Sequence, residues 1–367
     1  MKLVLVILSC FLILNSCTTK APSEPKNSTS DFDVKVLKWF DGHKSAVSIT
    51  YDAAWGNNPM LQNAVDEILQ RNLTMDFELV TKNYNNPDKY HLIEEFKTNL
   101  MPYGIHFYGH GNRHINHDSL SYSEAYDDFK LCFDLMKSWD LNPSAYAYPG
   151  ARGYLIRTQL ANKNAGFICA RGATVDPSKF YISPDTKTEP DNWFYLPAVF
   201  IGTQDTVLIN NHAEMQVVFN SALQKSAWII LMYHSIGIVG GWGYYPFAEF
   251  IKDLDYIKSE DFWSGNMDMV AKYIKERNNL VVQKTFLSSD SEMSIYKLRF
   301  SDYLDNELYN QPLSIQFETS DDLIQSIKII SSVGTITEKT VTNNVASFNI
   351  LPDEKDSKIY LIKSNMN

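Results

Sequence analysis

The chain has 367 residues, of which 33 are Lys or Arg and 43 are Asp or Glu, so its formal net charge is −10. This excess of acid argues against a general nucleic-acid-binding protein, whose affinity comes from basic groups on phosphates. Hydrophobic residues make up 44% of the sequence and charged residues 21%, which excludes an intrinsically disordered chain. The length fits one large domain with a smaller one, or two of medium size.

The N-terminus has the features of an export signal with a lipidation site. An apolar run from Leu3 to Leu14 is shorter than the about 20 residues that a membrane-spanning helix needs. It ends in Leu-Asn-Ser-Cys17, which resembles the lipobox of bacterial lipoproteins, where cleavage precedes a cysteine that carries the lipid. We therefore expect a signal peptide over 1–16, a flexible tether over 17–32 and a lipid-anchored protein of the bacterial cell envelope, on a membrane face that the sequence does not specify. An ordinary signal peptide with a chance cysteine is the alternative.

From about residue 45 to 280, short apolar strands alternate with amphipathic helices. A strand over 46–51 precedes a helix whose apolar positions, beginning at Leu61, repeat at helical spacing. Ser121 and Glu124 have the spacing of a capping box and predict the start of another helix. This alternation favours an α/β domain built from βα units around a parallel sheet or barrel. Further strands are expected over 73–80, 145–148, 167–170, 196–201 and 228–233, and further helices over 213–224, 247–257 and 267–277.

Beyond about Val282 the pattern changes to alternating strands without a convincing helix. The expected strands cover 294–300, 313–318, 327–330, 345–350 and 358–362. We therefore expect a small all-β, sandwich-like accessory domain over 282–367, which packs against the preceding domain or contacts a glycan.

Polar residues that suit metal-assisted hydrolysis follow several of the expected strands. His110 and His114 are four residues apart, so on a helical turn their imidazoles would face the same way and share one divalent ion. Asp52 closes one apolar strand and His234 closes another. Because the carboxyl ends of barrel strands meet at one mouth, these groups would supply a metal site, a base and an acid together.

These segments resemble the motifs of the polysaccharide deacetylases, the NodB-homology family also called carbohydrate esterase family four. Thr50 to Ala54 matches a motif that reads Thr-Phe-Asp-Asp-Gly in the family, and His110 to His114 matches His-Ser/Thr-x-x-His. The turn Tyr146 to Gly150 matches the third motif, and the strand ending at His234 matches Leu-x-His. The resemblance implies a distorted (β/α) barrel, expected here over 33–281, and a metal-dependent hydrolase that removes N- or O-linked acetyl groups from a polysaccharide.

The resemblance also implies roles for individual residues. Asp52 would be the general base, His234 the general acid, and His110 and His114 the ligands of a divalent metal, expected to be zinc, with cobalt or nickel as alternatives. A backbone N–H near Gly150 would stabilise the oxyanion. The residues expected to contact the sugar are Trp55, Tyr148, Gly150 and Trp242.

Two substitutions depart from the family pattern. Ala53 stands where the family has its second aspartate, a metal ligand, so the metal site is expected to be weak or absent unless another group replaces that ligand. Ala147 stands where an arginine usually contacts the base; Arg152 or Arg171 would then hold Asp52.

Other residues could replace the missing aspartate. On a straight helix His117 would lie about 10 Å from His110, too far to share one ion. Glu78 and Asp76 share one face of the strand that follows the Asp52 strand, and Glu78 is the candidate third ligand. The alternative is that both carboxylates pair with Lys, Arg or a hydroxyl group. Asp52 itself could also turn to the metal and leave the base role to another group.

The leading hypothesis is therefore a lipid-anchored envelope deacetylase whose partners are a polysaccharide and, through its lipid, a membrane. The alternatives are a non-catalytic glycan-binding protein of the same fold and a structural envelope lipoprotein that uses its β domain as a contact surface. The sequence contains no phosphate-cradling glycine loop, nucleophile elbow or zincin helix, which argues against a nucleotide partner, a serine hydrolase and a zincin-type metalloprotease.

Overall fold

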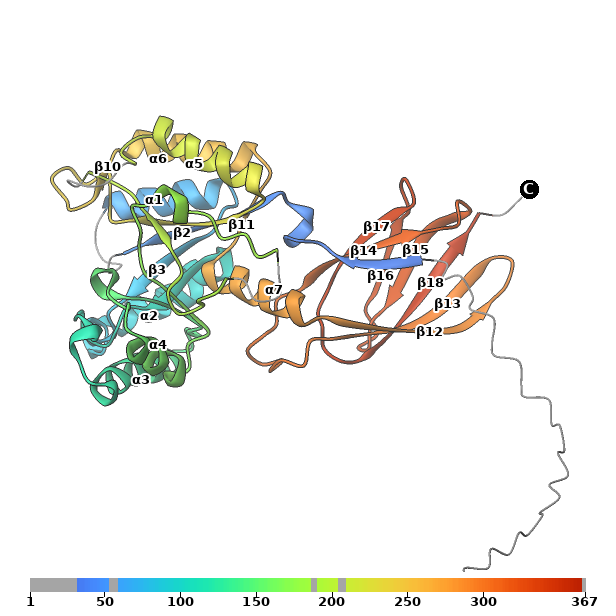
Figure 1. The fold of residues 1–367 in the computed structure, drawn as a ribbon, viewed down its shortest axis with the longest axis horizontal. Helices are drawn as coiled ribbons and strands as arrows, with labels where there is room; N and C mark the ends of the chain where they lie inside the picture. Colours follow the sequence, from blue (N-terminus) through green and yellow to red (C-terminus); the bar gives the residue numbers. More distant parts are fainter. Residues whose placement is uncertain (1–31, 53–58, 186–189, 204–208, 365–367) are drawn as a thin grey trace, which may run out of the picture.

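The computed structural model describes residues 32–52, 59–185, 190–203 and 209–364. It consists of an α/β barrel and a β-sandwich that lie next to each other along the long axis of the molecule (Figure 1). Cys17, Ala53 and Trp55 lie outside the described residues. Within the described part of the chain, no helix has the length and apolar character needed to cross a membrane.

The barrel is built on a parallel sheet with the strand order β6-β5-β4-β3-β2-β8-β7, and β11 pairs with β2 beside this path. Parallel bridges from Arg171 to Leu196 and from Thr174 to Val199 join the two ends of the sheet, so the barrel is nearly closed. Every residue of β2 and of β8 is buried, as expected for strands covered on both faces. The strands are β2 (Ser45–Tyr51), β3 (Met75–Leu79), β4 (Ile105–Gly109), β5 (Ala145–Ala147), β6 (Cys169–Arg171), β7 (Ala198–Phe200), β8 (Trp228–Tyr233) and β11 (Phe262–Ser264).

The helices alternate with these strands along the chain, which confirms the α/β expectation. One face of β2, with Val47 and Ile49, belongs to a core shared with residues of helices α1 to α6. The other face, with Ala46, shares a core with Met267 and Ile274 of α7. The capping box formed by Ser121 and Glu124 begins α3 as predicted. The helices are α1 (Pro59–Gln70), α2 (Tyr90–Glu95), α3 (Tyr122–Ser138), α4 (Ile156–Ala165), α5 (His212–Lys225), α6 (Phe247–Ser259) and α7 (Met267–Asn279).

The C-terminal part is all-β, as predicted, and contains two antiparallel sheets. One has the order β12-β13-β18-β15-β16 and the other the order β1-β14-β17. Alternate residues of their strands, such as Leu298, Ile315 and Leu361, are buried in one core. The strands are β12 (Val281–Ser289), β13 (Met293–Ser301), β14 (Leu313–Thr319), β15 (Ile324–Ile330), β16 (Ile336–Thr340), β17 (Val345–Ile350) and β18 (Asp356–Lys363).

The N-terminal strand β1 (Phe32–Val36) differs from the expected domain division. Residues from 33 onward were expected in the barrel, but β1 pairs antiparallel with β14 and is a strand of the sandwich. Phe32 is buried there, and its ring lies 5.0 Å from that of Tyr296. Its partner strand is more than 275 residues away in the sequence, so no local pattern could indicate this pairing. The sandwich is thus joined to the barrel by two chain segments, β1 to β2 and α7 to β12.

Candidate active site

Three of the expected residues meet at the carboxyl ends of the barrel strands. Asp52 follows β2, His110 follows β4 and His234 follows β8. His110 Nε2 lies 2.9 Å from Asp52 Oδ1, and His234 Nε2 lies 3.4 Å from Asp52 Oδ2. The two oxygens of one carboxylate therefore face two different imidazoles.

His114 joins this group, but not through a helical turn. Residues 110–116 form a loop, and Gly111 has a φ of +84°, a left-handed conformation that glycine adopts without strain. This turn brings the rings of His110 and His114 to 4.9 Å between centroids. Asp52, His110 and His114 each offer a ligand atom, and these atoms lie within 4.8 Å of one another. The expected helix was wrong because the chain reverses at Gly111, although both imidazoles still face the same site.

His110 is oriented as a metal-binding histidine would be. Its Nδ1 lies 2.9 Å from the carbonyl oxygen of Ala147, which can only accept a hydrogen bond, so the proton belongs on Nδ1. Its Nε2 is buried close to Asp52 but is not aligned for a hydrogen bond with any described residue. Carbonyl groups that accept a hydrogen bond from the other ring nitrogen orient metal-binding histidines in this way. The donor set therefore fits a divalent cation held by His110, His114 and Asp52.

Asp52 is the electrostatic centre of the site. Burial opposes its charge, but His110, His234 and Arg171 outweigh this effect and hold the pKa of Asp52 well below its ordinary value. Burial opposes the charge of His110 as well, yet Asp52 raises the pKa of His110. Burial lowers the pKa of His234, which favours the neutral imidazole. The site thus combines an ionised carboxylate with a neutral imidazole able to accept a proton.

Arg171 provides the cation beside Asp52 that alanine at position 147 cannot provide. Its side chain is fully buried, and Nη2 lies 3.8 Å from Asp52 Oδ2. Its Nε donates a hydrogen bond of 2.8 Å to Glu78 Oε1, and Nη2 pairs with the same oxygen. Arg152 is exposed. Of the two arginines considered from the sequence, Arg171 is the one in contact with the candidate base.

Glu78 is not placed as the replacement metal ligand. One of its oxygens is bound to Arg171, and the other, Oε2, is buried without a hydrogen-bond partner among the described residues. Burial raises the pKa of Glu78 to about 7. The carboxylate thus fits the alternative expectation that it pairs with an arginine, and it does not belong to the ligand set formed by Asp52, His110 and His114.

The other candidate replacements also have structural partners. Asp76 accepts hydrogen bonds from the Asn266 side chain at 2.6 Å and from the Met267 N–H at 2.9 Å, at the start of α7. His117 Nε2 lies 2.9 Å from Asp128 Oδ2. Neither Asp76 nor His117 belongs to the ligand set formed by Asp52, His110 and His114.

The expected sugar-contacting residues have different environments. Trp242 is 55% exposed and its ring meets the His234 ring edge-on at 4.2 Å. Gly150 lies in a tight turn with a φ of +59° and is exposed. Tyr148 is fully buried against Tyr146, so its assignment as a substrate-binding residue was wrong. The alternation of β5 turns both tyrosines into the core, a direction that the motif does not specify.

Phe200 is a site residue that the sequence reasoning did not single out. It ends β7, and its ring lies 5.3 Å from His234 and 5.2 Å from Trp242. Its place at the carboxyl end of a barrel strand is the signal that could have identified it. Together these two aromatic residues form an apolar border on one side of His234.

No family model matches this chain, and no curated protein matches its sequence. Several solved structures are similar to it at low identity. Agd3, described as a novel carbohydrate deacetylase, is 9% identical with a TM-score of 0.47; the alignment covers 88% of this chain and 66% of that one. The peptidoglycan deacetylase PdaC from Bacillus subtilis is 12% identical with a TM-score of 0.39, covering 64% and 92%.

A third similar structure is a pseudoenzyme of the CE4 family from Bacillus anthracis. It is 13% identical with a TM-score of 0.38, and the alignment covers 62% of this chain and 65% of that one. Of the three descriptions, this one names the family whose motifs the sequence resembles, and the other two name deacetylases. Because all three TM-scores are below 0.5, the function of this chain has to be argued from its own residues.

Proposed function

We propose that this protein is a metal-dependent deacetylase that removes acetyl groups from a polysaccharide. The observation that carries the proposal is the convergence of Asp52, His110 and His114 within 4.8 Å, with His234 on the opposite oxygen of Asp52. Motifs for a metal site and for an acid or base are thus brought together by strands distant in the sequence. Because alanine at position 53 cannot bind a metal ion, Asp52 supplies the carboxylate of the proposed metal site.

A divalent cation bound to these residues would polarise the acetyl carbonyl and make a water molecule easier to deprotonate. His234 is then the group that moves the proton. Its neutral imidazole can accept a proton from the attacking water and donate it to the leaving amine or hydroxyl oxygen. Asp52 Oδ2 faces Nε2 of His234 and stabilises the imidazolium while it carries the proton.

Arg171 and Trp242 support these roles. The Arg171 guanidinium keeps Asp52 ionised, because it is buried and close to Oδ2. Trp242 offers an exposed aromatic face beside His234, where a sugar ring would have to lie to present its acetyl group. We also propose that the protein is held at the bacterial envelope by a lipid on Cys17, on the basis of the apolar segment that precedes this residue.

Metal binding is the first test. Residues 18–367 are titrated calorimetrically with zinc, cobalt and nickel, together with His110→Ala and the matched control His91→Ala, which removes an exposed histidine on α2. We expect about one equivalent bound by the parent and by His91→Ala and none by His110→Ala. Acetate release from acetylated glycans should require the same metal. Binding that survives His110→Ala would contradict the proposed site.

A second candidate is a glycan-binding protein without catalysis. The specific observation in its favour is that Asp52 already has polar partners within the chain, with His110 Nε2 at 2.9 Å, His234 Nε2 at 3.4 Å and Arg171 Nη2 at 3.8 Å. The variant Ala53→Asp distinguishes the two functions. If it creates activity in an inactive parent, the native chain is the binding form; if the parent already binds metal and releases acetate, the deacetylase proposal holds.

A further inference from the structure

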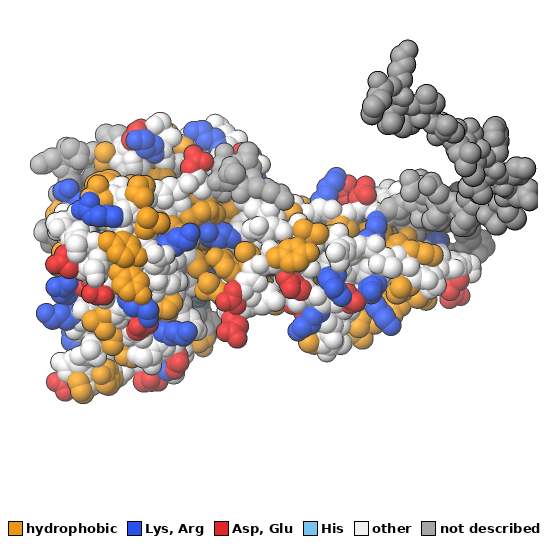
Figure 2. All heavy atoms as spheres, turned by 60° about the horizontal axis from the view of Figure 1, so that its bottom comes forward, with side chains coloured by type: hydrophobic (Ala, Val, Ile, Leu, Met, Phe, Trp, Pro, Cys, Tyr) orange, Lys and Arg blue, Asp and Glu red, His pale blue; other side chains and the backbone are white. Residues whose placement is uncertain are grey.

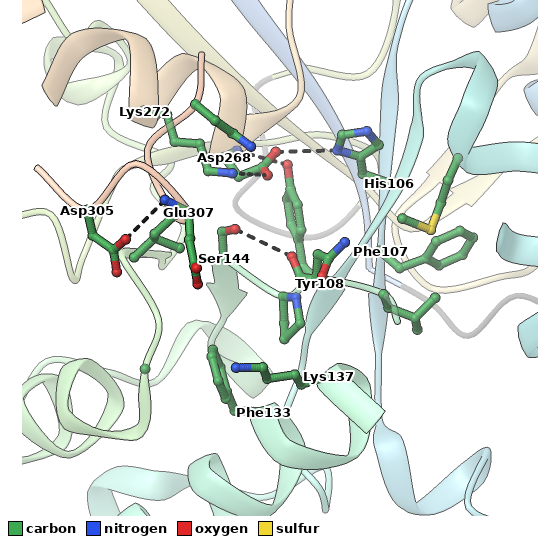
Figure 3. Close-up of a pocket in the computed structure, with 17 residues that line it drawn as sticks. His106, Phe107, Tyr108, Phe133, Lys137, Ser144, Asp268, Lys272, Asp305 and Glu307 are labelled. Carbon is green, nitrogen blue, oxygen red and sulfur yellow. Dashed lines mark hydrogen bonds and ion pairs between the residues drawn. The ribbon is translucent and has the colours of Figure 1, made fainter. Parts of the chain in front are cut away.

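Two neighbouring cavities lie at the end of the barrel opposite the candidate active site. The first has a volume of about 600 Å³ (Figure 3). It is lined by His106 of β4, by Ser144 before β5 and by residues from 305–310, the segment that connects β13 to β14 in the sandwich. The second, of about 530 Å³, adjoins the amino end of β6 and the segment 191–194. Both are lined by Gly166 and Leu308, so the two cavities adjoin each other, and we call them together the groove between the barrel and the sandwich. Each volume is in the range of small-molecule sites, roughly 300–1,000 Å³.

Helix α7 forms a wall of both cavities, but the charged side chains differ in their ion pairing between the two cavities. In the first, Asp268 lies 3.4 Å from His106 and 3.7 Å from Lys272, so the buried carboxylate has cationic partners (Figure 3). In the second, Lys275 of α7 and Lys163 of α4 line the same space. Neither has an ion pair with a described residue, and Asp191, the acid in this lining, is exposed and bridges neither lysine.

Lys275 is held in place without an anion. Its Nζ lies 4.0 Å from the centre of the Trp193 ring, a cation–π contact. Burial lowers the pKa of Lys275 to about 8, and the charge of Lys163 acts in the same direction. A half-buried ammonium beside a second one is unfavourable unless a ligand supplies negative charge.

The rest of the second cavity suits a ring with an apolar face. Trp193, Phe194 and Tyr309 are partly exposed and line it together with the apolar Leu160. Figure 2 shows Lys and Arg side chains among hydrophobic ones next to the junction of barrel and sandwich. Aromatic rings can accept the C–H face of a sugar, while paired ammonium groups bind a carboxylate.

We infer that this groove binds an anionic saccharide, with Lys163 and Lys275 on its carboxylate and Trp193 beside its ring. The site is separate from Asp52 and His234 and does not depend on the proposed reaction. The first cavity gives room for a neighbouring sugar unit, because it adjoins the second at Gly166 and Leu308. A polymer held here would bind at the opposite end of the barrel from the acetyl-hydrolysing groups.

The probe is tetragalacturonate, compared with its carboxyl-reduced counterpart, and binding to residues 18–367 is measured by calorimetry at two salt concentrations. We expect the acidic probe to bind and the reduced one to bind at least about tenfold more weakly. Lys163→Gln combined with Lys275→Gln should cause a similar loss. Lys130→Gln, which changes a partly exposed lysine of α3 that pairs with Asp134 and lines neither cavity, should have no effect.

Two further variants locate the binding. Trp193→Phe should remove the tryptophan fluorescence change on binding, and His234→Ala should leave affinity unchanged. Melting temperatures show that each variant is folded. Equal affinity for both probes, no binding at millimolar concentration, or full affinity in the double lysine variant would each overturn the inference. Loss of binding in His234→Ala would place the saccharide at the active site instead, and stronger binding of triglutamate would indicate an acidic peptide as the ligand.

Discussion

Asp76 and Glu78 occupy the same face of β3, two residues apart, and both are buried, but they serve opposite ends of the barrel. Asp76 accepts hydrogen bonds from Asn266 and from the Met267 N–H, and so fixes the start of α7 against the sheet. Glu78 pairs through one oxygen with Arg171, and its other oxygen has no partner among the described residues. Burial raises the pKa of each carboxyl group to about 7.

The difference shows how one strand can serve both folding and a functional site. At the amino end of β3, the Asp76 carboxylate accepts hydrogen bonds from groups at the start of α7, and buried polar groups usually have such partners. At the carboxyl end, Glu78, Arg171 and Asp52 form a chain of charges that ends at His110 and His234. Because the pKa is raised to a similar value at both ends, the incomplete pairing of Glu78 is the feature that distinguishes the carboxyl end.

The largest expected effect is on activity, and it should distinguish the carboxyl end of the barrel from the amino end. His234→Ala should lower acetate release by about 10²- to 10⁴-fold, because the proton carrier is lost, while the melting temperature changes little. The matched variant is His106→Ala, which removes the imidazole 3.4 Å from Asp268 at the amino end. It should lower the melting temperature but keep the activity per folded molecule. Equal losses of activity in both variants would contradict the assignment of His234.

The buried pair of Arg171 and Glu78 is the next test. Arg171→Met should reduce the free energy of unfolding by about 3–5 kcal/mol, because it leaves the Glu78 carboxyl group buried without a cation. The double variant with Glu78→Leu should recover much of that stability but not the activity, since Asp52 still lacks Arg171. Chemical denaturation and acetate release measure the two quantities. A double variant no more stable than Arg171→Met would show that the pair does not act as a unit.

At the amino end, Asp76→Ala should lower the free energy of unfolding by about 3 kcal/mol, because two buried donors lose their acceptor. Metal affinity should be unchanged in the fraction that remains folded. Denaturant unfolding followed by metal titration at low denaturant checks both statements. A specific loss of metal affinity would mean that the two ends of β3 are coupled.

The smallest effect concerns pH. The pKa of Asp76 is raised from 3.8 to about 7 in the folded state, so folding takes up a proton between these values. The contribution of Asp76 to stability is therefore greatest below about pH 4 and declines as the pH rises to about 7. Asp76→Asn removes this titration. The difference in unfolding free energy between the parent and Asp76→Asn should change across this range, and a constant difference would contradict the raised pKa.

Much of the barrel follows from local sequence patterns. The strand over 228–233 and the capping box at Ser121 appear where the sequence predicts them, because burial on both strand faces and helix capping depend on neighbouring residues. Asp52 and His234 could be named because each closes an apolar run, and His110 because of its spacing from His114. Positions that depend on contacts from elsewhere in the chain could not be derived, among them the burial of Tyr148 and the pairing of β1 with β14.

By itself, the sequence determined the alternating α/β pattern, the change to an all-β region and the identity of the residues able to bind a metal. Only the tertiary structure decided which of them meet. It turned Glu78 toward Arg171 instead of the histidines and placed Arg171 rather than Arg152 beside Asp52. It also left Lys163 and Lys275 together in one cavity. The physical reason is that periodicity specifies the face of a strand or helix, whereas partners across the barrel are set by how distant segments pack.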